Sequence, residues 1–142
     1  MERLSPGQGG APGFIPVTDG VCLLREPFGG TTTGIILVRG RENILIDAGG
    51  SAALVDSVLV PALAAQGLAP RDIDVLTCTH THGDHIGGFA RMRALGARCI
   101  AAYIKSVDKI RDPLRYNVKI RRAFPENSPP PSAGLVGTTV DT

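Results

Sequence analysis

All three histidines of the 142-residue chain lie within one short segment, residues 80–85. The same segment contains one aspartate, so four side chains of metal-ligating type follow closely on one another: His80, His82, Asp84 and His85. Neutral imidazole nitrogens and carboxylate oxygens are the ligands that zinc and similar divalent cations prefer. The segment therefore predicts a metal site, in preference to a polar surface loop that contains histidines by chance.

The elements expected around this segment place it at one edge of a sheet. Residues 73–77 predict a buried strand, and a helix is expected over residues 87–96. In extended backbone, side chains two positions apart point the same way, so the first two histidines can share one ion. The aspartate and the last histidine follow where the chain turns into the helix, within reach of a second ion. We expect tight turns for this convergence at three glycines: Gly83, Gly87 and Gly88.

This segment resembles the signature of the metallo-β-lactamase superfamily, a His-x-His-x-Asp-His loop that follows a buried strand. The resemblance implies that His80 and His82 bind a first metal ion, and that Asp84 and His85 bind a second. It also implies that Asp84 orients or deprotonates the attacking water. Asp47, at the end of an expected strand over residues 43–47, resembles the earlier acidic position of the family, which supports the metal loop without binding metal.

The resemblance covers about residues 15–103 and carries expectations about fold and cofactor. It implies an αββα four-layer sandwich, with helices outside two packed sheets and the metals at one edge. It also implies a hydrolase, in which two ions about 3.5–4 Å apart lower the pKa of a bound water toward 7 and polarise the bond under attack. Zinc, two ions in a complete domain, is the expected cofactor, and iron or manganese suits the same ligands.

The chain departs from the family pattern after the histidine segment. Members of the family add a downstream histidine, an aspartate that bridges the metals and a last histidine, whereas no histidine follows His85 here. For that reason Asp141 is not assigned as the bridge. Because the family domain runs to roughly 200 residues or more, we expect only its N-terminal half, from a truncated product or an incomplete gene; a complete domain with replaced ligands is the alternative.

Two properties are expected to follow if the chain exists alone. One face of the sheet would be bare, which favours aggregation. With two protein ligands for each ion, metal affinity would be far below that of a complete site, and the isolated chain would be inactive or nearly so.

The rest of the chain predicts a mixed α/β (α+β) fold with helices on one face of a sheet. Residues 1–13 are a Gly/Pro-rich lead-in, and residues 14–142 form one incomplete domain. Beyond the strands already named, we expect strands within 14–25, on both sides of a turn at Asp19-Gly20, and over 32–38 and 98–103. A helix should begin at Ser51, be kinked or broken at Pro61, and end at Gly67. A basic helix is expected after Ile104, and the proline run at 128–132 excludes regular structure.

Composition and charge restrict the class of protein. A hydrophobic fraction of 43% and a charged fraction of 20% are typical of a globular domain, and a net charge of +2 is too small to indicate nucleic-acid binding. No run approaches the roughly 20 apolar residues of a membrane span, and the opening residues lack the apolar core of a secretory signal, so we expect a cytoplasmic protein with no membrane partner. Three cysteines at unrelated spacings imply no disulfide framework and are expected to be buried thiols: Cys22, Cys78 and Cys99.

Three functions remain open on these residues. The first is hydrolysis of an acyl bond in a small-molecule substrate: an ester, thioester, lactone or lactam. The second is a nuclease-type enzyme acting on phosphodiesters, for which seven basic residues between 105 and 122 are the argument. We favour a solvated helix face for these residues, packed through Ile110, Leu114, Val118 and Ile120, and expect no nucleic-acid partner. The third is a degenerate, non-enzymatic fold or fragment. The sequence carries no signal for an oligomeric state.

Overall fold

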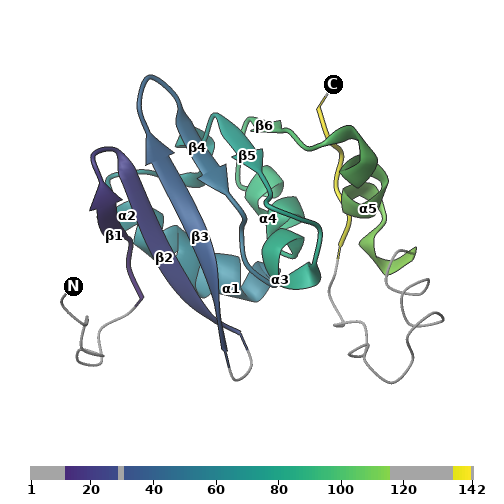
Figure 1. Cartoon of the computed structure of the whole chain (residues 1–142), viewed down its shortest axis with the longest axis horizontal. Helices are drawn as coiled ribbons and strands as arrows, with labels where there is room; N and C mark the ends of the chain where they lie inside the picture. Colours follow the sequence, from purple (N-terminus) through teal and green to yellow (C-terminus); the bar gives the residue numbers. More distant parts are fainter. Residues whose placement is uncertain (1–11, 29–30, 116–135, 142) are drawn as a thin grey trace.

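Six strands form one sheet in the computed structural model, which describes residues 12–28, 31–115 and 136–141 (Figure 1). The strands are neighbours in chain order: β1 (Ile15–Thr18), β2 (Val21–Phe28), β3 (Thr31–Arg39), β4 (Asn43–Ile46), β5 (Val75–Thr77) and β6 (Cys99–Ile100). The first four pair antiparallel, and β4–β5 and β5–β6 pair parallel. Parallel pairing requires crossover connections, and helices supply both of them. The mixed α/β class is confirmed.

The first crossover is one helical segment built from three parts. It contains α1 (Ala52–Leu54), the π-helical turn η1 (Val55–Leu59) and α2 (Val60–Ala65), and the short 3-10 helix η2 (Pro70–Asp72) follows. Ser51 caps the start, because its hydroxyl accepts from the Leu54 N–H at 3.2 Å. Gly67 follows the end with φ 74°, so both predicted boundaries are confirmed.

Pro61 does not break this segment. Proline lacks an N–H, and the hydrogen-bond pattern changes just before it, where the Val60 N–H bonds to the Val55 carbonyl. The predicted kink or break is therefore replaced by a π-helical turn.

The second crossover contains α3 (Gly83–Ile86) and α4 (Phe89–Ala94), and the 3-10 helix η3 (Ile104–Ser106) and α5 (Val107–Arg111) follow β6. Two predicted strands are shorter than expected. The strand expected over 73–77 pairs only as β5, and the one expected over 98–103 pairs only as β6. At the outer side of β6, Asp141 takes both backbone groups of Ile100: its N–H donates to the Ile100 carbonyl and its carboxylate accepts from the Ile100 N–H.

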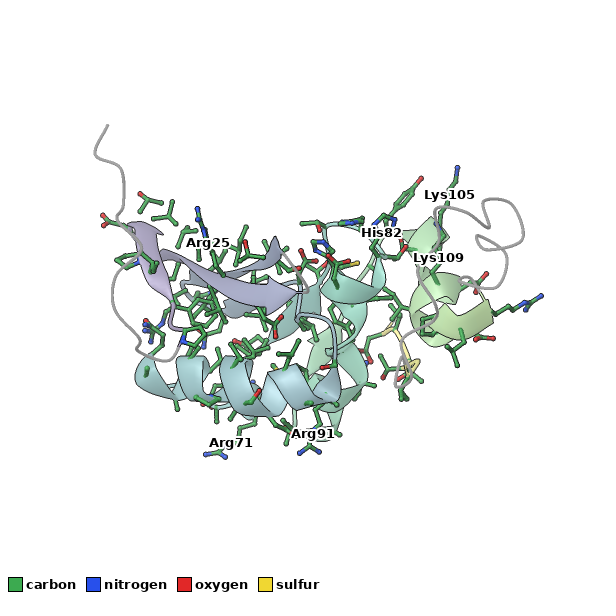
Figure 2. The ribbon with its side chains drawn as sticks, turned by 90° about the horizontal axis from the view of Figure 1, so that it is seen from below. Arg25, Arg71, His82, Arg91, Lys105 and Lys109 are labelled. Atoms are coloured by element: carbon green, nitrogen blue, oxygen red, sulfur yellow. The ribbon has the colours of Figure 1, made fainter. Side chains whose placement is uncertain are left out.

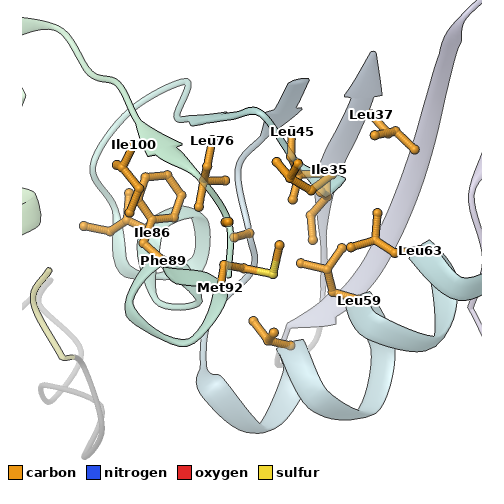
Figure 3. Packing of buried hydrophobic residues seen from close by; sticks show 14 of the residues in the cluster. Ile35, Leu37, Leu45, Leu59, Leu63, Leu76, Ile86, Phe89, Met92 and Ile100 are labelled. Atoms are coloured by element: carbon orange, nitrogen blue, oxygen red, sulfur yellow. The ribbon is translucent and has the colours of Figure 1, made fainter. Parts of the chain in front are cut away.

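The two faces of the sheet differ in what covers them. Helices α1, α2 and α4 lie on one face (Figures 1 and 2), and the side chains between them and the sheet are almost fully buried (Figure 3), among them Leu24, Ile35, Leu45, Leu59, Leu76, Phe89, Met92 and Ile100. Alternate strand residues on the opposite face are only half-buried: Leu23, Ile36, Val38, Ile44, Ile46 and Val75. The described residues thus supply one sheet and one helical layer of the expected four-layer sandwich.

Other expectations have mixed outcomes. Ile110 is 2% exposed and packs as predicted, whereas Leu114 is 46% exposed. The three cysteines are free but half-buried, not fully buried. Val118, Ile120, the proline run and most of the lead-in lie outside the described residues. Within the described part of the chain, no helix is both long and apolar enough to cross a bilayer.

Candidate metal centre

Two loops form the candidate site, one after β4 and one after β5. Because these strands are parallel, both loops leave the same edge of the sheet. Backbone bonds join them: the Asp47 N–H donates to the Thr77 carbonyl at 2.8 Å, and the Ala48 N–H donates to the His85 carbonyl at 2.9 Å. The loops therefore form one unit on which side chains from both can meet.

The glycines after the histidine segment are required by close packing of these loops, and not by turns. A Cβ atom at Gly87 would collide with the carbonyl oxygen of Gly50, and one at Gly88 would collide with that of Ala48. Their φ angles, −60° and −87°, are open to any residue. We expected Gly87 and Gly88 to allow tight turns, and this was wrong. These glycines instead allow the backbone of one loop to approach the backbone of the other.

Asp47 is the structural centre of the two loops. It is 3% exposed and accepts three hydrogen bonds. The Thr79 N–H donates to Oδ1 and the Thr79 hydroxyl to Oδ2, both at 2.8 Å, and Nδ1 of His85 lies 2.9 Å from Oδ2. Its backbone φ of 67° is in the left-handed region, which aspartate tolerates better than most residues. The carboxylate thus holds the start of the histidine segment and its last histidine together.

The hydrogen bonds determine which nitrogen each histidine presents. The single hydroxyl hydrogen of Thr79 goes to the Asp47 carboxylate, so its Oγ1 must accept from Nδ1–H of His80, at 3.0 Å. His85 likewise carries a hydrogen on Nδ1, which it donates to Asp47. In their neutral forms both rings therefore keep the lone pair on Nε2. A carboxylate that fixes a ring in this way is the usual support of a metal-ligating histidine.

The structure brings the four predicted ligands together. The ring centroids of His80 and His82 are 4.6 Å apart, and those of His80 and His85 are 4.1 Å apart. Oδ2 of Asp84 lies 3.3 Å from Nε2 of His85. His82 is at the N-cap of α3, whereas Asp84 and His85 are within this short helix. His82 is on the side of the molecule away from Arg71 and Arg91 (Figure 2).

The electrostatics favour the neutral, ligand form of one histidine and the neutral form of a nearby thiol. The pKa of His80 is lowered by partial burial and by the neighbouring His85 and His82, so the ring is neutral at pH 7. Burial and the charge of Asp47 raise the pKa of the Cys78 thiol to about 11. Thiolate is the form that binds metal, and without a metal ion Cys78 is a neutral thiol at pH 7.

The donor set fits a divalent metal in its chemistry but is short of a complete site. Nε2 of His85 and Oδ2 of Asp84 face one another at 3.3 Å, a position that requires a proton or a cation between two acceptors. Within the part of the chain that the structure describes, no three His, Cys, Asp or Glu side chains are arranged to hold an ion as they stand. The residues thus match the chemistry of zinc, and further ligands or a local rearrangement are needed to enclose an ion.

Two buried groups near the site were not identified from the sequence. The Thr33 hydroxyl donates to Asp84 Oδ2 at 3.2 Å. Glu26 is 1% exposed, and neither of its carboxyl oxygens has a hydrogen-bond partner among the described residues. Burial raises the pKa of Glu26 to about 7. One signal was available: Glu26 is an acidic residue in a strand whose alternate positions are apolar.

Asp141, which the sequence left unassigned, is held at the edge of the sheet. Its carboxylate accepts from Arg93 Nη2 at 2.6 Å and from the Ile100 N–H at 2.7 Å. These two hydrogen bonds lower the pKa of Asp141. The carboxylate is thus engaged beside β6.

Comparison with known proteins identifies a family. The sequence profile described as "Metallo-beta-lactamase superfamily" matches residues 27–140. Metallo-beta-lactamase domain-containing protein 1 of Mus musculus is 49% identical over 47 residues, which are 33% of this chain and 17% of the mouse protein. The Xenopus laevis protein of the same name is 40% identical over 53 residues, 37% of this chain and 22% of that protein. The matched stretch is thus a small part of these relatives.

Solved structures agree in fold. The TM-score is 0.68 with BJP-1, a subclass B3 metallo-beta-lactamase of Bradyrhizobium japonicum, at 18% identity over 92% of this chain and 45% of that one. It is 0.63 with a metallo-beta-lactamase family protein from Thermus thermophilus, at 24% identity over 89% of this chain and 47% of that one. The chain therefore matches slightly less than half of each solved structure.

Proposed function

Because the chain belongs to the metallo-beta-lactamase superfamily, we propose that its histidine cluster binds divalent metal and serves the hydrolysis of an acyl bond. One observation carries the proposal. Three imidazole rings and a carboxylate gather beside Asp47, which fixes one ring directly and another through Thr79. A surface loop without a ligand would have no reason to bury a carboxylate that orients two histidines in this way.

Each residue has a distinct role in the proposed reaction. His80 and His82 hold one ion, and Asp84 and His85 hold a second where the ligand set is complete. Zinc, the default metal for this donor set, would polarise the bond under attack and lower the pKa of a bound water toward 7. Asp84 would orient that water or accept its proton. Asp47 keeps the Nε2 lone pairs of His80 and His85 available to a metal ion. It binds Nδ1–H of His85 directly and orients His80 through the Thr79 hydroxyl.

We propose small-molecule esters, thioesters, lactones or lactams as the substrate class. The small net charge of +2 supports an uncharged or weakly charged substrate over nucleic acid. The chain spans less than half the length of the solved structures it matches, so the proposed activity is that of a domain with all its ligands. With two protein ligands for each ion, this chain by itself is proposed to bind metal weakly and to turn over slowly.

Hydrolysis by the zinc-loaded chain tests the substrate class. We would compare a nitrophenyl ester, a thioester and a lactam with a bis-nitrophenyl phosphodiester. Asp84→Asn should abolish any turnover, and Asp19→Asn, at an exposed aspartate, is the matched control. Turnover of the acyl substrates that is lost on chelation supports the proposal. Turnover that is confined to the phosphodiester, or is unchanged by Asp84→Asn, contradicts it.

A further inference from the structure

Thr33 is a buried threonine whose hydroxyl bonds to the site. It is 4% exposed, and its Oγ1 donates to Asp84 Oδ2 at 3.2 Å, between residues 51 positions apart in the sequence. A buried hydroxyl without a partner costs free energy. The burial of Thr33 therefore favours the arrangement in which this bond to Asp84 is made.

The sheet explains how so distant a residue reaches the site. β3 runs antiparallel to β4, with Ile36 opposite Ile46. The first residues of β3 therefore lie at the edge where β4 and β5 end, and α3, which carries Asp84, contacts β3. Thr33 projects from a paired strand of nine residues, whereas Asp84 is on a helix of only four. Pairing with β2 fixes the backbone position of Thr33, from which its hydroxyl can hold the Asp84 side chain in place.

The partner of Thr33 is informative because a second carboxyl lies beside it. Glu26 is directly opposite Thr33 on β2, and residues opposite one another in an antiparallel pair share one face of the sheet. Both oxygens of Glu26 nevertheless lack a partner in the described part of the chain. The Thr33 hydroxyl thus bonds to the carboxylate of Asp84 and not to that of Glu26, its neighbour on β2.

From this geometry we propose that Thr33 is a positioning residue that orients Asp84 for binding of the divalent ion. The inference rests on the proposed function. The bond to Oδ2 restrains rotation of the carboxylate, and the same oxygen is 3.3 Å from Nε2 of His85. With Oδ2 held from the strand, Asp84 and His85 keep a fixed relation to one another. Such supporting hydrogen bonds commonly change metal affinity by 10–100-fold.

Titration of the full chain with Co²⁺ tests the inference by calorimetry and visible absorption. Thr33→Val keeps the shape of the side chain and removes the hydroxyl. We expect it to weaken Co²⁺ binding about 10-fold and to alter the absorption bands. Thr33→Ser restores the donor and should restore the affinity and the spectrum. Thr32→Val, at the adjacent exposed threonine, is the matched control and should change neither. Thr33→Ala provides the same comparison if Thr33→Val does not fold.

A double-mutant comparison separates positioning from general stability. In an Asp84→Ala background, Thr33→Val should have no further effect on Co²⁺ affinity, because the carboxylate that it orients is gone. Unfolding of the metal-free variants in urea reports stability separately. A loss of stability with unchanged Co²⁺ affinity in Thr33→Val, or an equal loss of affinity in the Asp84→Ala background, overturns the inference and leaves the proposed function intact. If the unaltered chain binds no Co²⁺, the proposed function and this inference both fail.

Discussion

Two carboxylates are buried at the loop over residues 47–50, one from the loop itself and one from β2. They differ in the hydrogen bonds that they accept. Asp47 is 3% exposed and accepts three hydrogen bonds from Thr79 and His85. Glu26 is 1% exposed and accepts none from any described residue, although its carboxyl lies against Gly49, where a Cβ atom would collide with it. One carboxylate is held by three hydrogen bonds, and the other lies against the backbone of Gly49 with no donor among the described residues.

The difference shows how the loop is stabilised. Burial of a charge is tolerated where hydrogen bonds compensate for lost water, as at Asp47. Without such bonds burial favours the neutral acid, and the pKa of Glu26 rises to about 7. Asp47 therefore organises the site through its charge, whereas Glu26 fills space beneath the loop most favourably when it is protonated.

Removal of the Asp47 carboxylate should have the largest effect. Asp47→Ala leaves the Thr79 N–H, the Thr79 hydroxyl and His85 Nδ1 without their acceptor, and we expect a loss of about 3–4 kcal/mol in the free energy of unfolding. Asp47→Asn tolerates the same left-handed backbone but removes the charge, so it should cost less. Urea unfolding at pH 7 measures both. An alanine variant as stable as the unaltered chain would show that the three bonds do not hold the loops.

Glu26 should make stability depend on pH. Its pKa rises from 4.5 in the unfolded chain to about 7 in the folded one, so its contribution is fully present below pH 4.5 and is lost as the pH rises through 7. We expect the free energy of unfolding to fall by about 3 kcal/mol between pH 4.5 and pH 8 from this group. Glu26→Gln should remove that part of the pH dependence.

Glu42→Gln, at an exposed glutamate, is the control for this pH series. Its stability curve should follow that of the unaltered chain. If Glu26→Gln follows the unaltered chain as well, Glu26 is ionised in the folded protein and has a partner that the described residues do not supply.

A side chain at Gly49 should lower the free energy of unfolding by a smaller amount. Gly49 has φ 75°, and an added Cβ atom would also meet the Glu26 carboxyl. Gly67 has φ 74°, and a Cβ atom added there would meet nothing within 4 Å. Gly67→Ala therefore measures the cost of the left-handed backbone alone. We expect about 1 kcal/mol for Gly67→Ala and about 2 kcal/mol for Gly49→Ala. Glu26→Ala should recover the excess in a double variant. Equal losses at the two glycines would mean that Glu26 does not press on the loop.

The sequence predicted the parts of the site that are local and missed those that depend on packing. His80, His82, Asp84 and His85 lie within one segment, so their residue types alone place them together. The strands and the cap at Ser51 follow from apolar runs and turn residues. Asp47 was connected to the segment only by the family resemblance, and the structure shows its bonds.

The roles of Thr33 and Glu26 could not be predicted from any local sequence pattern. Their roles depend on the register of β2 against β3 and on the approach of α3 and the loop over residues 47–50. The short β6 was also beyond prediction, because its length is set by its pairing with β5, which joins only Val75 to Cys99 and Leu76 to Ile100. Pairing partners distant in sequence set these features.

Zinc titration of the purified chain tests the metal site most directly. The unaltered chain, His82→Ala, Asp84→Asn and the exposed control Asp19→Asn would be titrated by calorimetry with zinc alone. We expect the unaltered chain and the control to bind zinc equally, and His82→Ala and Asp84→Asn each to weaken binding at least about 10-fold. No binding by the unaltered chain, or binding that survives both substitutions unchanged, would contradict a metal site at this cluster.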